Sequence, residues 1–252
     1  MFNIGNSIKR NVLVSCDHGL FVVNRLDHTH TSVGGFLLDH GNNNTVEADL
    51  TIQALQNIED PVIFDVGANI GTYSSWVAKW SASKNGKVYA FEPQRIVFQM
   101  LCANMSINNI FNVYAFEMGL GDKKQQIKIV EADYNLIGSF GSYSLTKQNT
   151  PEYKSTNKQQ TINVDTLDNF VRVHKIPKVD FIKIDAEGMD IEVLNGSINT
   201  IKKFKPKLLV EYLNLGSTED EKSSTEGFGI LDTKLRDLGY RTKKINHDIY
   251  AY

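Results

Sequence analysis

The sequence predicts an α/β fold in which a parallel sheet is covered by helices on both faces. Two observations point to this fold class. Short apolar runs recur along the chain, and most are followed by a segment with the apolar spacing of a helix. Alternating strands and helices form βαβ units, which build a parallel sheet through right-handed crossovers. Prolines beside the apolar runs agree with this assignment, because proline cannot donate to a central ladder.

The predicted strands are apolar runs, three of them nearly continuous, which is typical of strands buried on both faces. They are Val62–Val66, Val88–Phe91, Val113–Leu120, Val179–Ile184 and Leu208–Val210. The predicted helices place apolar residues on one face, with spacings such as i, i+3 and i+7. They are Thr72–Ala82, Arg95–Ile107, Ile191–Phe204 and Ile230–Leu238.

Residues 1–60 depart from this alternation and are expected to form a small N-terminal cap. Their apolar runs are separated by Gly- and Asn-rich turns, which indicates a β-hairpin or a small antiparallel sheet. These runs are Val12–Val14, Leu20–Val23 and Phe36–Leu38. A helix near Val46–Ile58 closes the cap, which we expect to belong to one domain with residues 61–252.

Residues 133–160 form a long polar segment in which aromatic residues stand among Ser, Gly, Asn, Thr and Lys. These aromatic residues are Tyr134, Phe140, Tyr143 and Tyr153. A loop of this length in a compact domain is usually functional or disordered. The segment is therefore a candidate for ligand contact.

Composition argues against several functional classes. The 252 residues carry 27 Lys+Arg against 29 Asp+Glu, a net charge of −2, whereas a dedicated nucleic-acid binder usually shows a basic excess. No stretch approaches the roughly 18 consecutive apolar residues of a membrane span. The N-terminus lacks the pattern of a secretory signal, and the two cysteines, Cys16 and Cys102, form no redox or zinc motif. We expect a cytoplasmic protein with reduced thiols.

The most informative motif joins a predicted strand to a predicted helix. Its sequence is Phe64-Asp65-Val66-Gly67-Ala68-Asn69-Ile70-Gly71-Thr72. Gly67 and Gly71 permit a tight turn close to a ligand, and Asn69 tolerates left-handed backbone better than most residues. The helix that opens at Thr72 presents free N–H groups to an anionic group. The motif predicts a ligand site at the end of a strand that terminates in Asp65.

The next predicted strand also ends in an acid, in the sequence Tyr89-Ala90-Phe91-Glu92-Pro93. A carboxylate at that position can accept hydrogen bonds from the hydroxyls of a ribose. Together with the glycine turn, Glu92 indicates a nucleoside-containing cofactor. A nicotinamide-dependent oxidoreductase uses the same two features. The absence of a G-x-G-x-x-G pattern counts against that alternative.

Further acids end two later strands. In Phe181-Ile182-Lys183-Ile184-Asp185-Ala186-Glu187-Gly188, the strand period places Lys183 and Asp185 on one face. Glu211 ends the strand that follows. These carboxylates could act as a base, as a substrate clamp or as metal ligands, since ligands bind outside the carboxyl ends of such strands. Structural pairing among Lys183, Asp185 and Glu211 is the alternative.

Taken together in order and spacing, several motifs carry a family resemblance. They are Asp65-Val66-Gly67-Ala68-Asn69-Ile70-Gly71, Phe91-Glu92-Pro93, Gly119-Leu120-Gly121-Asp122, Gly141-Ser142-Tyr143-Ser144-Leu145, Val164-Asp165-Thr166-Leu167-Asp168 and Ile182-Lys183-Ile184-Asp185-Ala186-Glu187-Gly188. This series resembles the FkbM family of methyltransferases over roughly residues 12 to 212. One departure is Met189-Asp190, where the family more often has a small residue and Glu.

The resemblance implies the class I methyltransferase fold, a Rossmann-like, seven-stranded and mostly parallel sheet with helices on both faces. It implies S-adenosylmethionine as cofactor, bound across the tips of the first three strands. The segment from Asp65 to Gly71, with Thr72, would hold the methionine part. Glu92, followed by Pro93, would hold the ribose, and the loop from Gly119 to Asp122 the adenine. The implied activity is O-methylation of hydroxyls on sugars, polysaccharides or macrocyclic natural products.

For the reaction itself, Asp185 is our first candidate for the general base and Glu187 the second. Glu211 would orient either one, and Lys183 would hold Asp185 ionised. A divalent cation between Asp185 and Glu211 is the alternative way to acidify the acceptor hydroxyl, and the sequence does not decide between them.

The expected partner is a sugar or glycan acceptor, in contact with residues 133–160 and the loop Asn214–Phe228. Nucleic acid is not expected, and the protein would be a monomer or a homodimer. A non-catalytic scaffold with the same fold is a further alternative, although the acids expected at the crevice argue against it. His28, His30 and His40 are expected to be ordinary surface or turn residues, because their spacing fixes no metal geometry.

Overall fold

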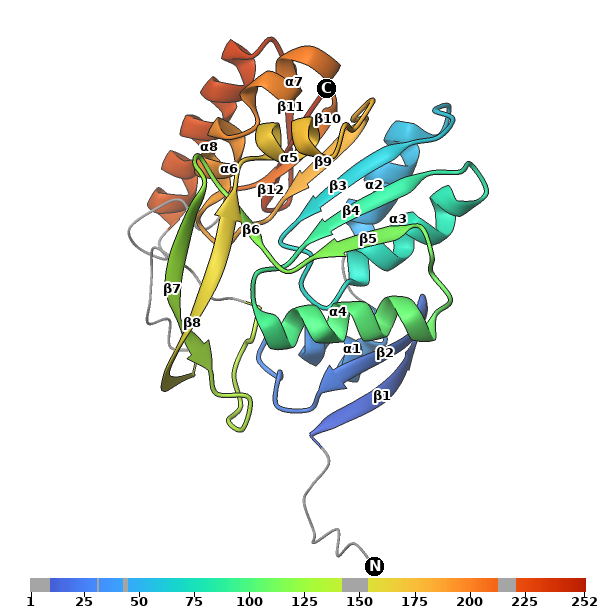
Figure 1. The fold of residues 1–252 in the computed structure, drawn as a ribbon, viewed down its shortest axis with the longest axis vertical. Helices are drawn as coiled ribbons and strands as arrows, with labels where there is room; N and C mark the ends of the chain where they lie inside the picture. Colours follow the sequence, from blue (N-terminus) through green and yellow to red (C-terminus); the bar gives the residue numbers. More distant parts are fainter. Residues whose placement is uncertain (1–9, 31, 43–44, 142–153, 213–220) are drawn as a thin grey trace, which may run out of the picture.

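The computed structural model describes residues 10–30, 32–42, 45–141, 154–212 and 221–252. Its centre is a seven-stranded sheet in the order β11-β12-β10-β9-β3-β4-β5 (Figure 1). The strands are β3 (Val62–Val66), β4 (Lys87–Phe91), β5 (Val113–Phe116), β9 (Phe181–Ile184), β10 (Lys207–Glu211), β11 (Thr242–Ile245) and β12 (Asp248–Ala251). Within this sheet β12 pairs antiparallel with β10 and β11, and the other pairs of neighbouring strands are parallel. The predicted α/β class with a mostly parallel seven-stranded sheet is confirmed.

The strand order reverses at the centre of the sheet. The chain moves outward from β3 through β4 to β5, and it later returns to place β9 on the other side of β3. In the register, Val66 at the end of β3 lies opposite Phe91 of β4 and Ile184 of β9. Ligands of open α/β sheets bind outside the carboxyl ends of strands at such a reversal. The segments that leave β3, β4 and β9 therefore meet at one edge.

Helices cover both faces, as the strand pattern requires. On one face, α2 (Thr45–Leu55), α3 (Thr72–Ala82) and α4 (Arg95–Ile107) share a core with Ile63 and Phe181 of the sheet. On the other face, Phe64 and Ile182 pack with the helices that follow β8 in the chain. Those helices are α5 (Leu167–Val173), α6 (Asp190–Asn195), α7 (Ile198–Phe204) and α8 (Glu221–Asp237). The alternation of side chains along β3 and β9 thus divides the core into two layers.

A second sheet of three strands lies beside this layered unit, in the order β6-β8-β7 (Figure 1). Its strands are β6 (Gly119–Leu120), β7 (Gln125–Ala132) and β8 (Ser155–Asp165). The prediction of one strand over Val113–Leu120 is therefore wrong, because the run leaves the first sheet after Phe116 and pairs with β8 from Gly119. Part of the predicted loop 133–160 is also strand, since β8 begins at Ser155.

Other boundaries also differ from the predictions. The predicted helix Ile191–Phe204 is two helices, broken at Gly196, where an added Cβ would lie 1.9 Å from the Gly121 carbonyl oxygen. Phe36–Leu38 lies in the helix α1 (Val33–His40) rather than in a strand. The helix near Val46–Ile58 is α2, Thr45–Leu55, and α8 begins before the predicted Ile230.

The N-terminal hairpin consists of β1 (Asn11–Cys16) and β2 (Gly19–Asn24), and it lies against α4 (Figure 1). Two asparagines four residues apart make this contact, Asn104 on α4 and Asn108 at its C-cap. Asn104 accepts a hydrogen bond from Val22 N (2.6 Å), and Asn108 accepts one from Leu20 N (3.0 Å). Their amide groups also donate to the carbonyl oxygens of the same two residues. These side chains thus satisfy the outer edge of β2, which would otherwise leave backbone groups unpaired.

Throughout the described part of the chain, no helix combines the length and the apolar character needed to cross a membrane.

Candidate cofactor and active site

The turn after β3 has a backbone that suits glycine. Gly67 has φ +82°, and an added Cβ would lie 1.8 Å from the carbonyl oxygen of Asp185. The N–H groups of Gly67 and Ala68 both donate to Phe91 O, at 3.0 and 2.9 Å. Asn69 adopts φ +51°, the left-handed conformation expected at this position. The turn is thereby fixed against the ends of both β4 and β9.

The turn leads directly into α3. Gly71 has φ +89° and directly precedes Thr72, the first residue of α3. A Cβ added to Gly71 would lie 2.5 Å from Leu101 Cδ1 of α4. Thr72 is buried at the start of α3. This close packing explains why the second glycine of the motif is needed, while the helix start supplies backbone N–H groups.

Glu92 follows β4 and is 5% exposed. Its Oε2 accepts a hydrogen bond from Asn69 N (3.1 Å), and its Oε1 accepts one from Gln94 N (2.8 Å). Burial raises the pKa of Glu92 to about 7, although the two backbone donors oppose this shift. The glycine turn and the acid at the end of β4 are therefore one hydrogen-bonded unit.

A buried lysine joins the acids at the ends of β3 and β9. Lys183 Nζ donates to Asp185 Oδ2 at 2.8 Å and lies 4.0 Å from Asp65 Oδ1. Ser74 donates to Asp65 Oδ2 at 2.5 Å, whereas Asp65 Oδ1 accepts no hydrogen bond from the described residues. Burial opposes the charge of Lys183, but Asp185 and Asp65 together raise its pKa above the usual value. Lys183 is therefore a permanent cation at this edge.

Further carboxyl groups lie close enough to Asp185 to raise one another's pKa. Burial and the neighbouring carboxylates raise the pKa of Glu187 and that of Glu211 well above the usual value. Burial raises the pKa of Asp190 and that of Asp248 to about 7, and Asp185 contributes to both shifts. The structure thus brings the predicted acids Asp185, Glu187 and Glu211 together.

Asp190 and Asp248 were not among the predicted site residues. Asp190 accepts hydrogen bonds from Ala186 N (2.8 Å) and Gly188 N (3.1 Å), so its carboxylate holds the loop that carries Glu187. Met189-Asp190, where the family more often has a small residue and Glu, therefore lies where Asp190 holds this loop by hydrogen bonds. Asp248 lies opposite Glu211 in the register of β10 and β12. No local signal in the sequence indicated it, because β12 itself was not predicted.

The loop predicted to hold the adenine lies beside Pro93, which follows the acid predicted to hold the ribose. An added Cβ on Gly119 would contact Pro93 Cβ at 3.8 Å, and one on Gly121 would contact Met189 at 3.8 Å. Gly121 N donates to Asp165 O (3.0 Å), which ties the loop to β8. Asp122 is exposed at the end of this loop. Gly119 is thus adjacent to the Glu92 turn.

In the described ranges, no group of three or more His, Cys, Asp or Glu side chains has an arrangement that could hold a metal ion. His28 forms a hydrogen bond with Asp39 through Nε2 at 3.0 to 3.1 Å, and this pair lies on the surface.

Tyr143 and Tyr153, predicted to contact the acceptor, lie outside the described residues, as does much of Asn214–Phe228. Phe140 is buried and packs edge-on against Tyr134, at 4.9 Å between ring centroids.

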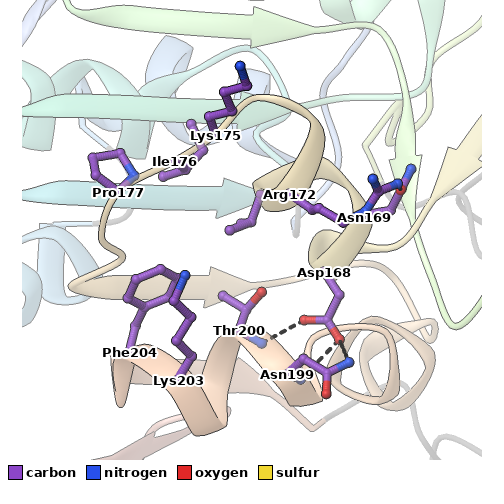
Figure 2. Close-up of a pocket in the computed structure, with 11 residues that line it drawn as sticks. Asp168, Asn169, Arg172, Lys175, Ile176, Pro177, Asn199, Thr200, Lys203 and Phe204 are labelled. Atoms are coloured by element: carbon purple, nitrogen blue, oxygen red, sulfur yellow. Dashed lines mark hydrogen bonds between the residues drawn. The ribbon is translucent and has the colours of Figure 1, made fainter.

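A cavity of about 690 Å³ lies elsewhere, between α5 and α7 (Figure 2). Its wall includes Asp168, whose carboxylate accepts hydrogen bonds from Asn199 N (3.0 Å) and Thr200 N (2.7 Å), as the dashed lines show. Asp168 therefore caps the start of α7. None of the predicted site residues lines this cavity.

The fold corresponds to that of the class I methyltransferases. The crystal structure of Methyltransferase FkbM from Methylobacillus flagellatus KT matches with a TM-score of 0.51 at 19% identity, over 77% of this chain and 44% of that chain. A model of the Methyltransferase FkbM domain matches residues 65–242, well over half of the chain. The chain belongs to the FkbM methyltransferase family.

Two curated relatives match part of the chain. The hexuronic acid methyltransferase AglP of Haloferax volcanii is 30% identical over 144 residues, covering 57% of this chain and 53% of the relative. Methyltransferase 1 of Beauveria bassiana is 27% identical over 149 residues, covering 55% of this chain and 59% of the relative. The matched part of the chain thus spans little more than half the length of these relatives.

Proposed function

We propose that the protein is an S-adenosylmethionine-dependent O-methyltransferase that acts on a hydroxyl of a sugar or glycan. The observation that carries this proposal is the meeting of three elements at one sheet edge: the glycine turn after β3, Glu92 after β4 and the Lys183–Asp185 pair of β9. Family membership and a curated relative named for a hexuronic acid support the activity and the acceptor class.

The described residues fit the proposed cofactor in charge. Gly67 and Gly71 allow the turn to pack against Asp185 and Leu101, which fixes it at the edge of the sheet. The carboxyl groups around Asp185 outnumber Lys183, which is the one buried Lys or Arg among the described residues. A ligand that carries ammonium and sulfonium groups would favour the ionised form of these carboxyl groups. Asp65 Oδ1, buried without a hydrogen-bond donor, can accept one from such an ammonium group.

The bound cofactor would supply an activated methyl group, so the protein must position an acceptor oxygen and remove its proton. Asp185 suits the base role because its side chain is 33% exposed and pairs with the Lys183 cation. Glu187 and Glu211 suit it less, since burial and the neighbouring carboxylates raise their pKa values and so favour the protonated form. We assign Asp185 as the base, Lys183 as the group that keeps it ionised, and Glu211 as a positioning carboxyl.

The test is transfer of a labelled methyl group from S-adenosylmethionine to a panel of neutral and uronic-acid glycans. The wild-type protein is expected to label at least one glycan. Asp185→Asn should then lower kcat about 10²- to 10⁴-fold with both substrates saturating. Asp168→Asn, which alters a carboxylate at the start of α7, is the matched control and should retain turnover.

Two results would contradict these assignments. Near-normal turnover of Asp185→Asn would exclude Asp185 as the base. Hydride exchange with a nicotinamide cofactor, without methyl transfer, would replace the proposed activity with that of an oxidoreductase.

A further inference from the structure

The N-terminal cap and the proposed cofactor site are joined by buried hydrogen bonds. Asp27, just after the hairpin, is 5% exposed. Its Oδ2 accepts from Gly34 N of α1 and its Oδ1 from Phe140 N, both at 2.9 Å. Both carboxylate oxygens are therefore used to hold two segments that are far apart in the sequence.

The chain of hydrogen bonds continues from Phe140 to the glycine turn. Gln94 Nε2 donates to Phe140 O at 2.9 Å, and Gln94 N donates to Glu92 Oε1 at 2.8 Å. The other oxygen of Glu92 accepts from Asn69 N at 3.1 Å. Gln94 and Phe140 are buried. Asp27 is thus connected to the ribose acid through two buried residues.

Other contacts also join the N-terminal hairpin, the segment around Phe140 and the glycine turn. Asn104 of α4 donates to Ile70 O of the glycine turn (2.9 Å) and accepts from Val22 N of the hairpin (2.6 Å). The residue after Phe140, Gly141, lies against the turn, because an added Cβ would be 2.1 Å from Asn69 Nδ2. One hydrophobic cluster also contains Ile70, Phe140 and the hairpin residue Phe21.

We propose that Asp27 and Gln94 are positioning residues for the ribose end of the cofactor site, so that the N-terminal cap is part of the catalytic unit. The proposal rests on the proposed function. A carboxylate whose side chain and neighbours are locked by packing and hydrogen bonds loses less freedom when a ligand binds, which strengthens binding. Glu92 would contact the ribose hydroxyls, whereas Asp27 and Gln94 act through it.

Calorimetric titration with S-adenosylhomocysteine provides the test. Gln94→Met keeps the size of the side chain but removes the donor to Phe140 O, and we expect affinity to fall about tenfold. Gln126→Met is the matched control, because the Gln126 side-chain amide donates an exposed hydrogen bond to Asn163 Oδ1 (3.0 Å), away from the turn. It should bind like the wild type. Gln94→Leu, which also lacks the donor, repeats the test if the methionine variant does not fold.

A second comparison uses the carboxylates. Asp27→Asn leaves one acceptor oxygen for two N–H donors and should also weaken binding several-fold. Asp168→Asn is its control, because Asp168 of α5 likewise accepts from two distant backbone N–H groups, which belong to α7. We expect this control to lower the melting temperature without changing affinity.

A double variant of Glu92 and Gln94 distinguishes a positioning role of Gln94 from general damage to the fold. If Gln94 acts through Glu92, the double variant Glu92→Gln/Gln94→Met should bind no more weakly than Glu92→Gln alone. Additive losses would overturn the proposal, as would wild-type affinity in both Gln94→Met and Asp27→Asn. A wild-type protein that binds no S-adenosylhomocysteine would instead refute the proposed function itself, together with this inference.

Discussion

At the scale of single residues, the site is governed by where charge is buried. Lys183 contacts Asp185 directly and lies 4.0 Å from Asp65, so this one cation is shared between the ends of β3 and β9. Glu92 has no such cation partner in the described structure, and burial raises its pKa to about 7. Ligand binding at Glu92 should therefore depend on pH near neutrality.

Affinity for S-adenosylhomocysteine should rise as pH increases through 6 and 7, and it should level off above about pH 8. The pKa of Glu92 is about 7 in the free protein. Ribose hydroxyls that donate to its carboxylate favour the ionised form, so the bound pKa is lower and binding releases a proton. Titrations across this range measure the slope. Glu92→Gln should weaken binding and flatten that slope, whereas an unchanged slope would remove Glu92 from the ribose site.

The backbone at Gly67 gives a second prediction at this scale. Gly67→Ala should destabilise the protein by about 2 kcal/mol or more, because its Cβ cannot fit beside the Asp185 carbonyl oxygen. Gly239→Ala is the control, since Gly239 has φ +91° with nothing within 4 Å of an added Cβ. Gly239→Ala should lower the free energy of unfolding by only about 1 kcal/mol, the cost of alanine in the left-handed backbone conformation. Equal losses in urea unfolding would show that the contact with Asp185 is unimportant.

At the scale of elements, predictions from sequence succeeded where one apolar period dominates. The boundaries of α3 and α4 were predicted as observed, because their apolar residues keep helical spacing up to clear turn signals. β8 was missed because its first half, rich in Thr, Lys and Gln, shows little apolar alternation. The break at Gly196 depends on contact with Gly121, which is distant in the sequence.

The candidate site divides in the same way. The carboxylates at Glu92 and Asp185 could be predicted because each directly follows an apolar strand. The support from Gln94 and Asp27 could not, since it depends on the position of Phe140 in the folded chain. Local pattern thus identifies groups at strand ends, whereas tertiary contacts decide what holds them.

The contact between α4 and the hairpin provides a prediction at this scale. Asn104→Leu should lower the free energy of unfolding by about 2 to 3 kcal/mol, because the buried Ile70 carbonyl oxygen loses its donor. Asn108→Leu should cost about 1 kcal/mol, since its bonds to Leu20 are exposed to water. Urea unfolding measures both variants. A larger loss for the Asn108 variant would contradict this account of the interface.

At the scale of the whole molecule, buried carboxyl groups gather on one side of the sheet and around the cap. Those with a raised pKa of about 6 to 7 are Asp27, Glu92, Asp190 and Asp248. A folded-state pKa above the ordinary carboxyl value means that the folded protein binds more protons than the unfolded chain between these two values. Stability should therefore fall as pH rises through that window.

The melting temperature should thus be lower at pH 7.5 than at pH 5.5, by on the order of 5 °C or more. Asp248→Asn removes one of these titrations without adding charge, so it should reduce the difference between the two temperatures. Calorimetric scans of both proteins make the comparison. A melting temperature that rises with pH over this range would show that these groups are not buried as the structure indicates.

Binding of S-adenosylmethionine at the edge formed by β3, β4 and β9 underlies the whole proposal. Calorimetric titration of the purified protein with S-adenosylhomocysteine, with NAD as the parallel ligand, is therefore the decisive measurement. We expect saturable binding of S-adenosylhomocysteine at one site per chain and no binding of NAD. Binding of NAD alone, or of neither ligand, would contradict it.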